Sequence, residues 1–344
     1  MPDTLTETLM FTEAREGGDA VARFLDRNRD GLKALAARLR AHPPKVVITC
    51  ARGSSDHAST YGKYVIETLT GVPVASAALS VSSVYATTPV ADQALVIAVS
   101  QSGRSPDLLT TVAAHKAAGA HVVALVNDES APLADLADTV LPLSAGPEKS
   151  VAATKSCLVS MVAYAALAAE WSEHTALKDA LRALPDQMRT AFDSDWRAAL
   201  PDFTAARNLF IIGRGYGLGI AQEAALKLKE TCALHAEAFS AAEVRHGPMA
   251  IIREGFPLLA LATSDAAGDG VRDAAREFAA RGAKVWLADS LSPAPHTLPA
   301  QTAHPALEPI LRLQSFYRFA NALSLARGLN PDTPPHLNKV TQTV

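Results

Sequence analysis

The chain has 344 residues, of which 49% are hydrophobic and 19% charged, a composition typical of a globular protein and not of a disordered one. This length is sufficient for two α/β domains of ordinary size. The formal net charge of −3 gives no overall attraction to nucleic acid or to an anionic membrane, so any phosphate site must be local. The three cysteines (Cys50, Cys157 and Cys232) are odd in number and widely spaced, which disfavours a disulfide framework or a zinc site.

Neither the N-terminus nor the longest apolar stretch is typical of a secreted or membrane-spanning protein. Residues 1–10 carry acids and hydroxyls where a secretory signal has a basic start and an apolar run. The longest uncharged apolar stretch, 156–169, is too short to cross a bilayer and predicts a buried helix. We therefore expect a cytoplasmic protein that binds no nucleic acid and no membrane.

Short apolar strands alternate with helices along the first half of the chain. Helical spacing of apolar residues from about 12 to 39 leads to the helix-breaking pair Pro43-Pro44. Strands are then predicted at 45–50, 94–99 and 121–126. The first strand leads into Arg52-Gly-Ser-Ser55 and a helix, and the second leads into Ser100-Gln-Ser-Gly-Arg-Ser105 and a helix that ends at Ala118.

The second half repeats this pattern. Strands are predicted at 208–212, 256–262 and 285–288, with helices that run through 230, to 280 and over 307–327. The pair Gly119-Ala120 recurs as Gly282-Ala283, and the Arg-Gly pair at Arg52 recurs at Arg214. The two repeats are offset by nearly the same number of residues. Two landmarks at one offset indicate an internal duplication.

These elements predict an α/β protein with two tandem copies of one unit. Each copy is expected to be a parallel sheet with helices on both faces, a flavodoxin-like three-layer sandwich. The expected parts are an N-terminal helical segment (1–42), a first domain with connecting helices (43–200), a second domain (201–328) and a tail (329–344). Prolines prevent regular structure in the tail, which must cover another part of the protein to be ordered.

The loops that follow the first two strands suit a phosphate monoester. In an open parallel sheet, ligands bind at the carboxyl ends of the strands, where loops meet helix N-termini. Ser54-Ser55 and the segment 100–105 supply hydroxyls, a glycine and exposed N–H groups there. The alternative is that these residues only cap helices. The glycines of 213–219 match neither a Walker A loop nor a dinucleotide fingerprint.

Charged residues concentrate between 223 and 248. On a helix, Glu223, Lys227 and Glu230 share one face, and a carboxylate beside a lysine in an apolar setting suits a general base. The alternative is a solvated face with salt bridges, which is usual for this pattern. His246 precedes a helix-breaking Gly-Pro pair, although a lone histidine is more often structural than catalytic.

These segments resemble the sugar isomerase (SIS) domain family, and in particular the isomerase half of glucosamine-6-phosphate synthase and the SIS-type glucosamine-6-phosphate deaminases. The resemblance implies two tandem SIS domains. The matching segments, in the family's order, are Gly53-Ser-Ser55, Ser100-Gln-Ser-Gly103, Val151-Ala-Ala-Thr-Lys155, 223–230, 235–239, 243–248 and Leu337-Asn-Lys-Val340.

The resemblance also implies a role for each matching residue. Glu230 moves the proton between C1 and C2 of the sugar, with Lys227 beside it, and His246 assists ring opening from the other subunit of a homodimer with shared active sites. Lys339 closes over the sugar and is a candidate for a Schiff base with the ketose carbonyl. The residues that would bind the hexose 6-phosphate substrate are Ser55, Ser100, Gln101, Ser102, Ser105, Val151, Ala153 and Asn338.

The sequence departs from the synthase at several positions that would contact the substrate. Arg104 stands in place of an acid, Ala153 in place of a serine, and His336 and Asn338 in place of an arginine and an alanine. The chain starts Met-Pro, without the N-terminal cysteine nucleophile of an amidotransferase domain. We therefore expect the protein to hydrolyse glucosamine 6-phosphate to fructose 6-phosphate and ammonia, with no metal and no cofactor.

Other readings remain open. One alternative is a synthase-like isomerase. Another is a deaminase or deglycase that acts on a different 6-phosphosugar. A reading from a different class is a non-catalytic sugar-phosphate sensor, which the presence of Glu230, His246 and Lys339 together disfavours.

Overall fold

The computed structural model describes residues 8–291 and 295–339, which form two compact units. Of the described residues, the first-sheet unit comprises Asp19–Glu148, Lys155–Leu181 and Asn338-Lys339, and the second-sheet unit comprises 8–18, Lys149–Thr154, 182–291 and 295–337. The domain boundaries expected from the sequence stay a prediction. Expectations for residues 1–7 and 340–344, including Val340 at the end of the tail, lie outside the described residues.

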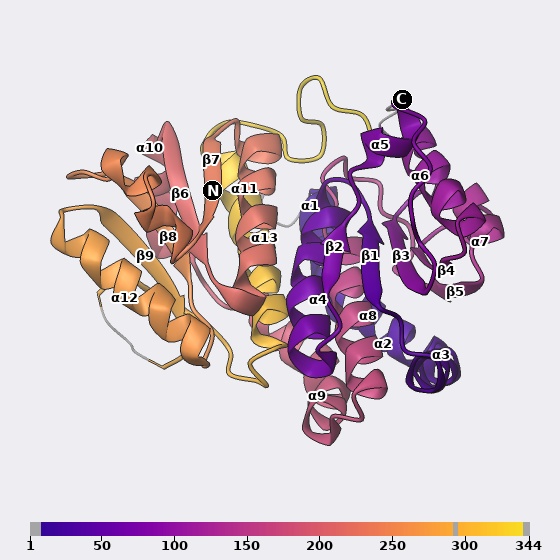
Figure 1. The fold of residues 1–344 in the computed structure, drawn as a ribbon. Coiled ribbons are helices and arrows are strands. Elements are labelled where there is room, and N and C mark those ends of the chain that lie inside the picture. Colours follow the sequence, from indigo (N-terminus) through magenta and orange to yellow (C-terminus); the bar gives the residue numbers. More distant parts are fainter. Residues whose placement is uncertain (1–7, 292–294, 340–344) are drawn as a thin grey trace. The chain divides into compact units, whose positions relative to one another are not determined.

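The first sheet has five parallel strands in the order β2-β1-β3-β4-β5 (Figure 1). The strands are β1 (Val46–Cys50), β2 (Val74–Ser76), β3 (Ala94–Ser100), β4 (His121–Val126) and β5 (Thr139–Pro142). The three strands that the apolar runs predict are present, whereas the short strands β2 and β5 were not predicted.

The second sheet repeats this topology. Its strands are β6 (Asn208–Gly213), β7 (His235–Ser240), β8 (Pro257–Leu261), β9 (Lys284–Asp289) and β10 (Thr297–Pro299). They lie in the order β7-β6-β8-β9-β10, and every pairing is parallel. Numbered from its own first strand, each sheet therefore has the order 2-1-3-4-5, the flavodoxin-like arrangement. The predicted α/β class and the duplication are confirmed.

Helices cover both sheets. The helices that lie in or enter the first-sheet unit are α2 (Gly17–Arg27), α3 (Arg29–Ala41), α4 (Ser54–Thr70), α5 (Leu79–Ser83), α6 (Pro106–Ala117), α7 (Pro132–Leu136), α8 (Lys155–Trp171) and the start of α9 (Thr175–Phe192). The second-sheet unit contains α1 (Leu9–Arg15), α10 (Leu200–Ala205), α11 (Leu218–Cys232), α12 (Ala266–Ala280), α13 (Glu308–Ala326) and the short 3-10 turns η2 (Arg197–Ala199), η3 (Gly215–Gly217), η4 (Glu243–Arg245) and η5 (Pro248–Ile251).

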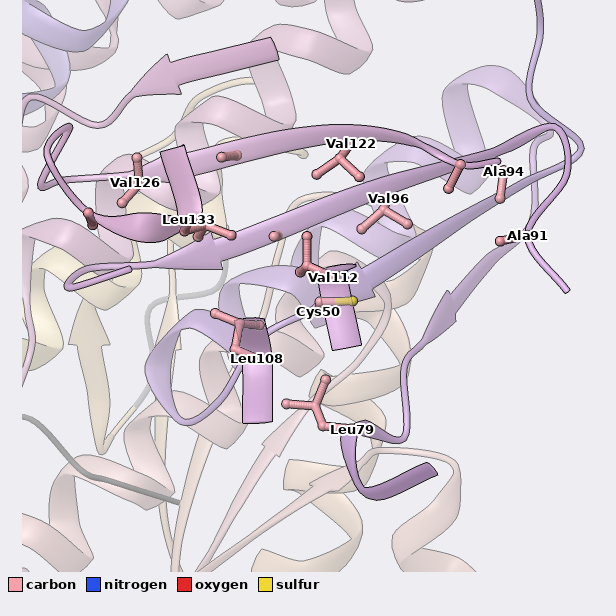
Figure 2. Close-up of a cluster of buried hydrophobic side chains, with 14 residues drawn as sticks. Cys50, Leu79, Ala91, Ala94, Val96, Leu108, Val112, Val122, Val126 and Leu133 are labelled. Carbon is pink, nitrogen blue, oxygen red and sulfur yellow. The ribbon is translucent and has the colours of Figure 1, made fainter. Parts of the chain in front are cut away.

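The central strand β3 explains why the first sheet forms. All seven of its residues are buried, as expected for a strand that is covered on both faces. Val96 lies on one face, in a cluster with Val122 of β4 and with Leu108 and Val112 of α6 (Figure 2). Because successive side chains of a strand alternate between faces, the neighbouring Ile97 is buried on the other face.

Helix α8 packs closely against α4 in the same unit. Nearly every residue of α8 is buried, which confirms the helix predicted from the apolar stretch 156–169. Among the described residues, no helix is both long and apolar enough to cross a bilayer. The ring of Tyr164 occupies the space beside Gly62, where an added Cβ would lie 2.4 Å from ring atoms, and the Tyr164 hydroxyl is 3.0 Å from Ser59 Oγ. The close approach of the two helices therefore depends on glycine at position 62.

In the second-sheet unit, a buried ion pair fills the edge where the strands end. The guanidinium of Arg272 donates to both carboxylate oxygens of Asp289, each at 2.9 Å, and to the carbonyl oxygen of Thr263 at 2.7 Å. The first turn of α12 packs directly on the turn after β8, so that a Cβ at Gly268 would lie 1.7 Å from that same carbonyl oxygen. Protein atoms thus fill the space around this turn.

We expect Gly62→Ala to destabilise the protein. Alanine is favoured over glycine in a helix by about 1 kcal/mol, but the added methyl would overlap the Tyr164 ring, and overpacking of this kind costs about 1–3 kcal/mol. Urea unfolding gives the difference. The control is Lys63→Ala at the adjacent exposed position, which should change the free energy of unfolding by less than about 0.5 kcal/mol. Equal stability of Gly62→Ala and the natural protein would contradict this account.

We expect Asp289→Asn to cost about 3 kcal/mol at pH 7, because it leaves the Arg272 guanidinium buried without its carboxylate. Burial, the largest single cause, raises the pKa of Asp289, but the hydrogen bonds from Arg272 and the Leu291 N–H, together with the charges of Arg272 and Arg312, outweigh it and lower that pKa. A carboxyl with a lowered folded-state pKa stabilises the fold above its unfolded pKa, near 4, and loses this contribution as the pH falls toward the folded value. The cost of the substitution should therefore shrink below about pH 4.

Denaturant unfolding at several pH values measures this cost. Asp269→Asn is the matched control, since Asp269 also pairs with Arg272 but its side chain is 73% exposed. The prediction would be contradicted if the two variants had the same free energy of unfolding at pH 7, or if the difference between them did not change with pH.

Candidate active site

The first candidate site lies where β1 and β3 end. These strands are neighbours in the sheet, and the helices that follow them, α4 and α6, begin at the same edge. In this strand order, ligands bind in the crevice at the point between β1 and β3 where the order reverses. The predicted residues all lie at this edge: Ser55 is in the first turn of α4, Ser100 is the last residue of β3, and Gln101, Ser102 and Ser105 are in the loop that follows.

Glycine shapes both loops. Gly53 precedes α4 with φ +55°, and Gly103 has φ +63° with no room for a Cβ, which would lie 2.6 Å from Ala131. The hydroxyl oxygen of Ser100 accepts the N–H of Gly103 at 2.9 Å, so this serine also fixes the turn. Ser105 occupies the N-cap position of α6, but its side chain does not cap the helix. Helix capping alone therefore does not explain Ser105.

The second candidate site is a line of charges on α11. Lys227 is fully buried and forms ion pairs with Glu230, one turn further on, and with Glu223 at 3.5 Å. Glu223 is 1% exposed, whereas the side chain of Glu230 is 22% exposed. The hydroxyl of Tyr317 in α13 donates to the other end of the line, Glu223 Oε1, at 3.1 Å. The shared helix face predicted from the sequence is present, and it is not a solvated one.

The tail is held at two places. In the second-sheet unit, the carboxylate of Asp332 accepts the N–H groups of Leu9 and Met10 at 2.8 and 2.7 Å, at the start of α1. In the first-sheet unit, the ammonium of Lys339 donates to Glu148 at 3.4 Å. Glu148 is buried and also accepts both the N–H and the hydroxyl of Ser156. The tail thus contacts other segments within each unit, as its composition requires.

The remaining predicted residues occupy separate positions. Val151 and Ala153 lie in the segment that joins the second-sheet unit, and the Val151 N–H donates to the carbonyl oxygen of Asp332 at 3.4 Å. Asn338 precedes Lys339 in the tail. His246 is exposed at the end of η4, and the described residues place no hydrogen bond or ion pair between its ring and Glu230.

Sequence reasoning missed the residues that hold the predicted ones in place. Glu148 contacts Lys339, and Tyr317 contacts Glu223 at the other end of the α11 line, in each case across a large separation in the sequence. Of these two, only Glu148 had a local signal, since it lies three residues before the matching segment 151–155.

A cavity of about 540 Å³ lies in the first-sheet unit, away from the serine loops. It is bounded by the end of α3 and by the starts of β3 and β4, and its lining includes Arg38, His42, Asp92 and His121. Because these strands begin at this edge, it is the edge opposite to the serine loops. Burial and the charge of Arg38 lower the pKa of His121.

Comparison with known proteins identifies the class. The SIS domain family matches residues 42–170 and 202–290, which contain the first sheet and strands β6 to β9 of the second. The chain therefore belongs to the SIS domain family, and the resemblance inferred from its motifs is confirmed.

Individual relatives narrow this further. A solved candidate phosphosugar isomerase from Silicibacter pomeroyi DSS-3 is 43% identical, with a TM-score of 0.90 over 94% of this chain and 100% of that one. The glutamine–fructose-6-phosphate aminotransferase (isomerizing) of Aeropyrum pernix is 36% identical over 325 residues, 88% of this chain and 52% of the relative. That of Symbiobacterium thermophilum is 33% identical over 98% of this chain and 56% of the relative. The chain thus spans about half the length of these curated relatives.

The stability of the α11 charges is testable. We expect Lys227→Met to cost about 3 kcal/mol or more, because it leaves Glu223 buried beside a second carboxylate with no cation between them. Adding Glu223→Gln should recover part of the loss, since the two side chains interact directly. Urea unfolding measures both variants. Lys229→Met, at an exposed position of the same helix, is the control, and a loss no larger than that of this control would refute the prediction.

Proposed function

We propose that this protein is an aminosugar-phosphate deaminase and isomerase, which hydrolyses glucosamine 6-phosphate to fructose 6-phosphate and ammonia. The proposal assigns phosphate recognition to the serine loops of the first-sheet unit and proton transfer to α11 of the second-sheet unit. Relatives at 33–36% identity carry the name of an isomerizing aminotransferase of fructose 6-phosphate, which supports a 6-phosphosugar as substrate.

The observation that carries the proposal is the environment of Glu230. Its carboxylate pairs with a lysine that is itself fully buried, and it is the one member of the α11 line with substantial exposure. A carboxylate can accept a proton, and the exposure of this one allows a substrate to reach it. Lys227 is also fixed from its other side by Glu223, which Tyr317 holds. The base is thus positioned before any substrate arrives.

The reaction follows from this base. His246 would assist opening of the sugar ring to the free aldehyde. Glu230 then takes the proton from C2, which gives an enolamine, and returns it to C1, which gives a ketimine at C2. Water adds to that carbon and ammonia leaves, so that one water is consumed for each ammonia released. Lys339 of the tail would close over the open-chain sugar. Isomerisation and deamination share the same C1–C2 proton transfer, so the deaminase needs no group beyond these and water.

Ammonia release from a panel of phosphosugars tests the proposal. Glucosamine 6-phosphate, galactosamine 6-phosphate, fructose 6-phosphate and glucose 6-phosphate are given separately to the purified protein, and ammonia and ketose phosphate are measured. We expect ammonia and fructose 6-phosphate from the first substrate. Glu230→Gln should lower kcat by about 10²–10⁴-fold, the usual contribution of a general base. Glu254→Gln, at an exposed loop position, is the matched control.

Other outcomes identify the alternatives. Turnover of a different 6-phosphosugar, with no ammonia from glucosamine 6-phosphate, would refute the proposed substrate and leave an isomerase or deglycase. Binding without turnover of any sugar would refute catalysis and favour a sugar-phosphate sensor.

A further inference from the structure

An ion pair links the two loops of the first candidate site. Arg52 lies in the loop between β1 and α4, and Asp107 lies in the first turn of α6, after the serine loop. Arg52 donates from Nε and Nη2 to the same carboxylate oxygen, Asp107 Oδ2, at 3.0 and 2.8 Å. A cation is thus present at the point between β1 and β3 where a ligand of this fold binds.

The two partners of this pair differ in exposure. The side chain of Asp107 is 1% exposed, and its other oxygen accepts the N–H of Leu108, so this carboxylate is fully engaged inside the protein. The side chain of Arg52 is 54% exposed. A guanidinium has five N–H donors, of which the pair uses two, and the described residues give Nη1 no partner. Asp107 therefore fixes the orientation of a guanidinium whose outer edge is open to solvent.

A phosphate monoester needs such a group. It carries nearly two negative charges at pH 7, whereas the serine and glutamine side chains predicted to bind it are neutral donors. Ser100 already accepts the Gly103 N–H and has only its own O–H left to donate. An arginine adds charge and pairs with phosphate through two parallel hydrogen bonds.

A second arginine of these loops is oriented less firmly. Arg104, within the serine loop, donates from Nη2 to Asp128 at 2.8 Å, beyond the end of β4 and thus on the side away from β1. Asp128 is itself 39% exposed, whereas Asp107 is 1% exposed, so the exposed Arg104 pair fixes its guanidinium less well than the Arg52 pair does. Asp56, in the first turn of α4, is the acid nearest to Arg52 in the sequence. Burial raises the pKa of Asp56, whereas the charges of His57 and Arg52 and a hydrogen bond with Ser76 of β2, on the other side of β1, act to lower it.

We propose that Arg52, oriented by Asp107, is the cation that binds the phosphate group of the substrate and selects the phosphorylated, dianionic form of the sugar. This inference rests on the proposed sugar-phosphate substrate. It adds to the serine loop a charged contact that comes from the neighbouring strand, and it assigns Asp107 the part of a positioning residue.

Titration calorimetry with inorganic phosphate and with glucosamine 6-phosphate tests the inference, in a Glu230→Gln background so that no turnover occurs. We expect Arg52→Gln to weaken both affinities by about 10- to 100-fold, the usual worth of charge-assisted hydrogen bonds, and Arg52→Lys to recover part of the loss. Asp107→Asn keeps the cation and should lose less than Arg52→Gln. Arg27→Gln, which breaks an exposed ion pair of the same unit, is the control and should change neither affinity.

Two further measurements separate phosphate binding from a structural role of the pair. The affinity of the natural protein for glucosamine 6-phosphate should rise between pH 5 and pH 7, as the dianion of the monoester forms with a pKa near 6, and this rise should be smaller in Arg52→Gln. If Arg52 only joined the loops, Arg52→Gln and Asp107→Asn would lower affinity equally and Arg52→Lys would not differ from Arg52→Gln. That pattern would overturn the inference.

The outcome is independent of the deamination assay. Ammonia release together with unchanged phosphate affinity and unchanged KM in Arg52→Gln would overturn the inference and leave the proposed function intact. Phosphate binding that depends on Arg52, without ammonia release, would support the inference and overturn the proposed deamination. Absence of binding by any phosphosugar and by phosphate would overturn both.

Discussion

All strand pairs in the described residues are parallel. After each strand, the chain must therefore cross back to the opposite edge of the sheet before the next strand starts. Every loop that leaves a strand's carboxyl end therefore emerges at one edge, beside the N-terminus of a helix. The serine loops and Arg52 share an edge for this reason, although they are separated along the chain. Backbone topology alone brings the hydroxyls, the N–H groups and the cation of the first-sheet unit together.

The α11 site depends on a different constraint, the cost of burying charge. Lys227 has no access to water, and it is tolerated there because carboxylates lie on both sides of it along the helix. The line is stiff as a result, since a shift of any member leaves another buried charge without its partner. Tyr317 completes it from a second helix. The stiffness suits a base that must return a proton to an adjacent carbon without moving far.

Sequence patterns predicted what is local and missed what is distant. The central strands were predicted because their apolar runs are continuous, and the α11 face because spacings of three and four residues define it. The edge strands β2 and β10 have three residues each, and β7 is only partly buried, so none of them has a clear pattern. Tyr317 and Glu148 lie 94 and 191 residues from the side chains that they contact, and no spacing rule covers such pairs.

The duplicated fold provides two equivalent crevices, yet the two have diverged. At the first, the Ser100 hydroxyl accepts the N–H of Gly103 and fixes the loop after β3, and Gly103 packs against Ala131. At the second, the loop after β8 packs against α12. The guanidinium of Arg272 donates hydrogen bonds to the carbonyl oxygen of that turn and to the carboxylate of Asp289. In the second copy the Arg272 guanidinium thus has its partners within the protein, whereas in the first copy the Arg52 guanidinium keeps an outer edge open to solvent. The second copy therefore contributes rigidity at this turn.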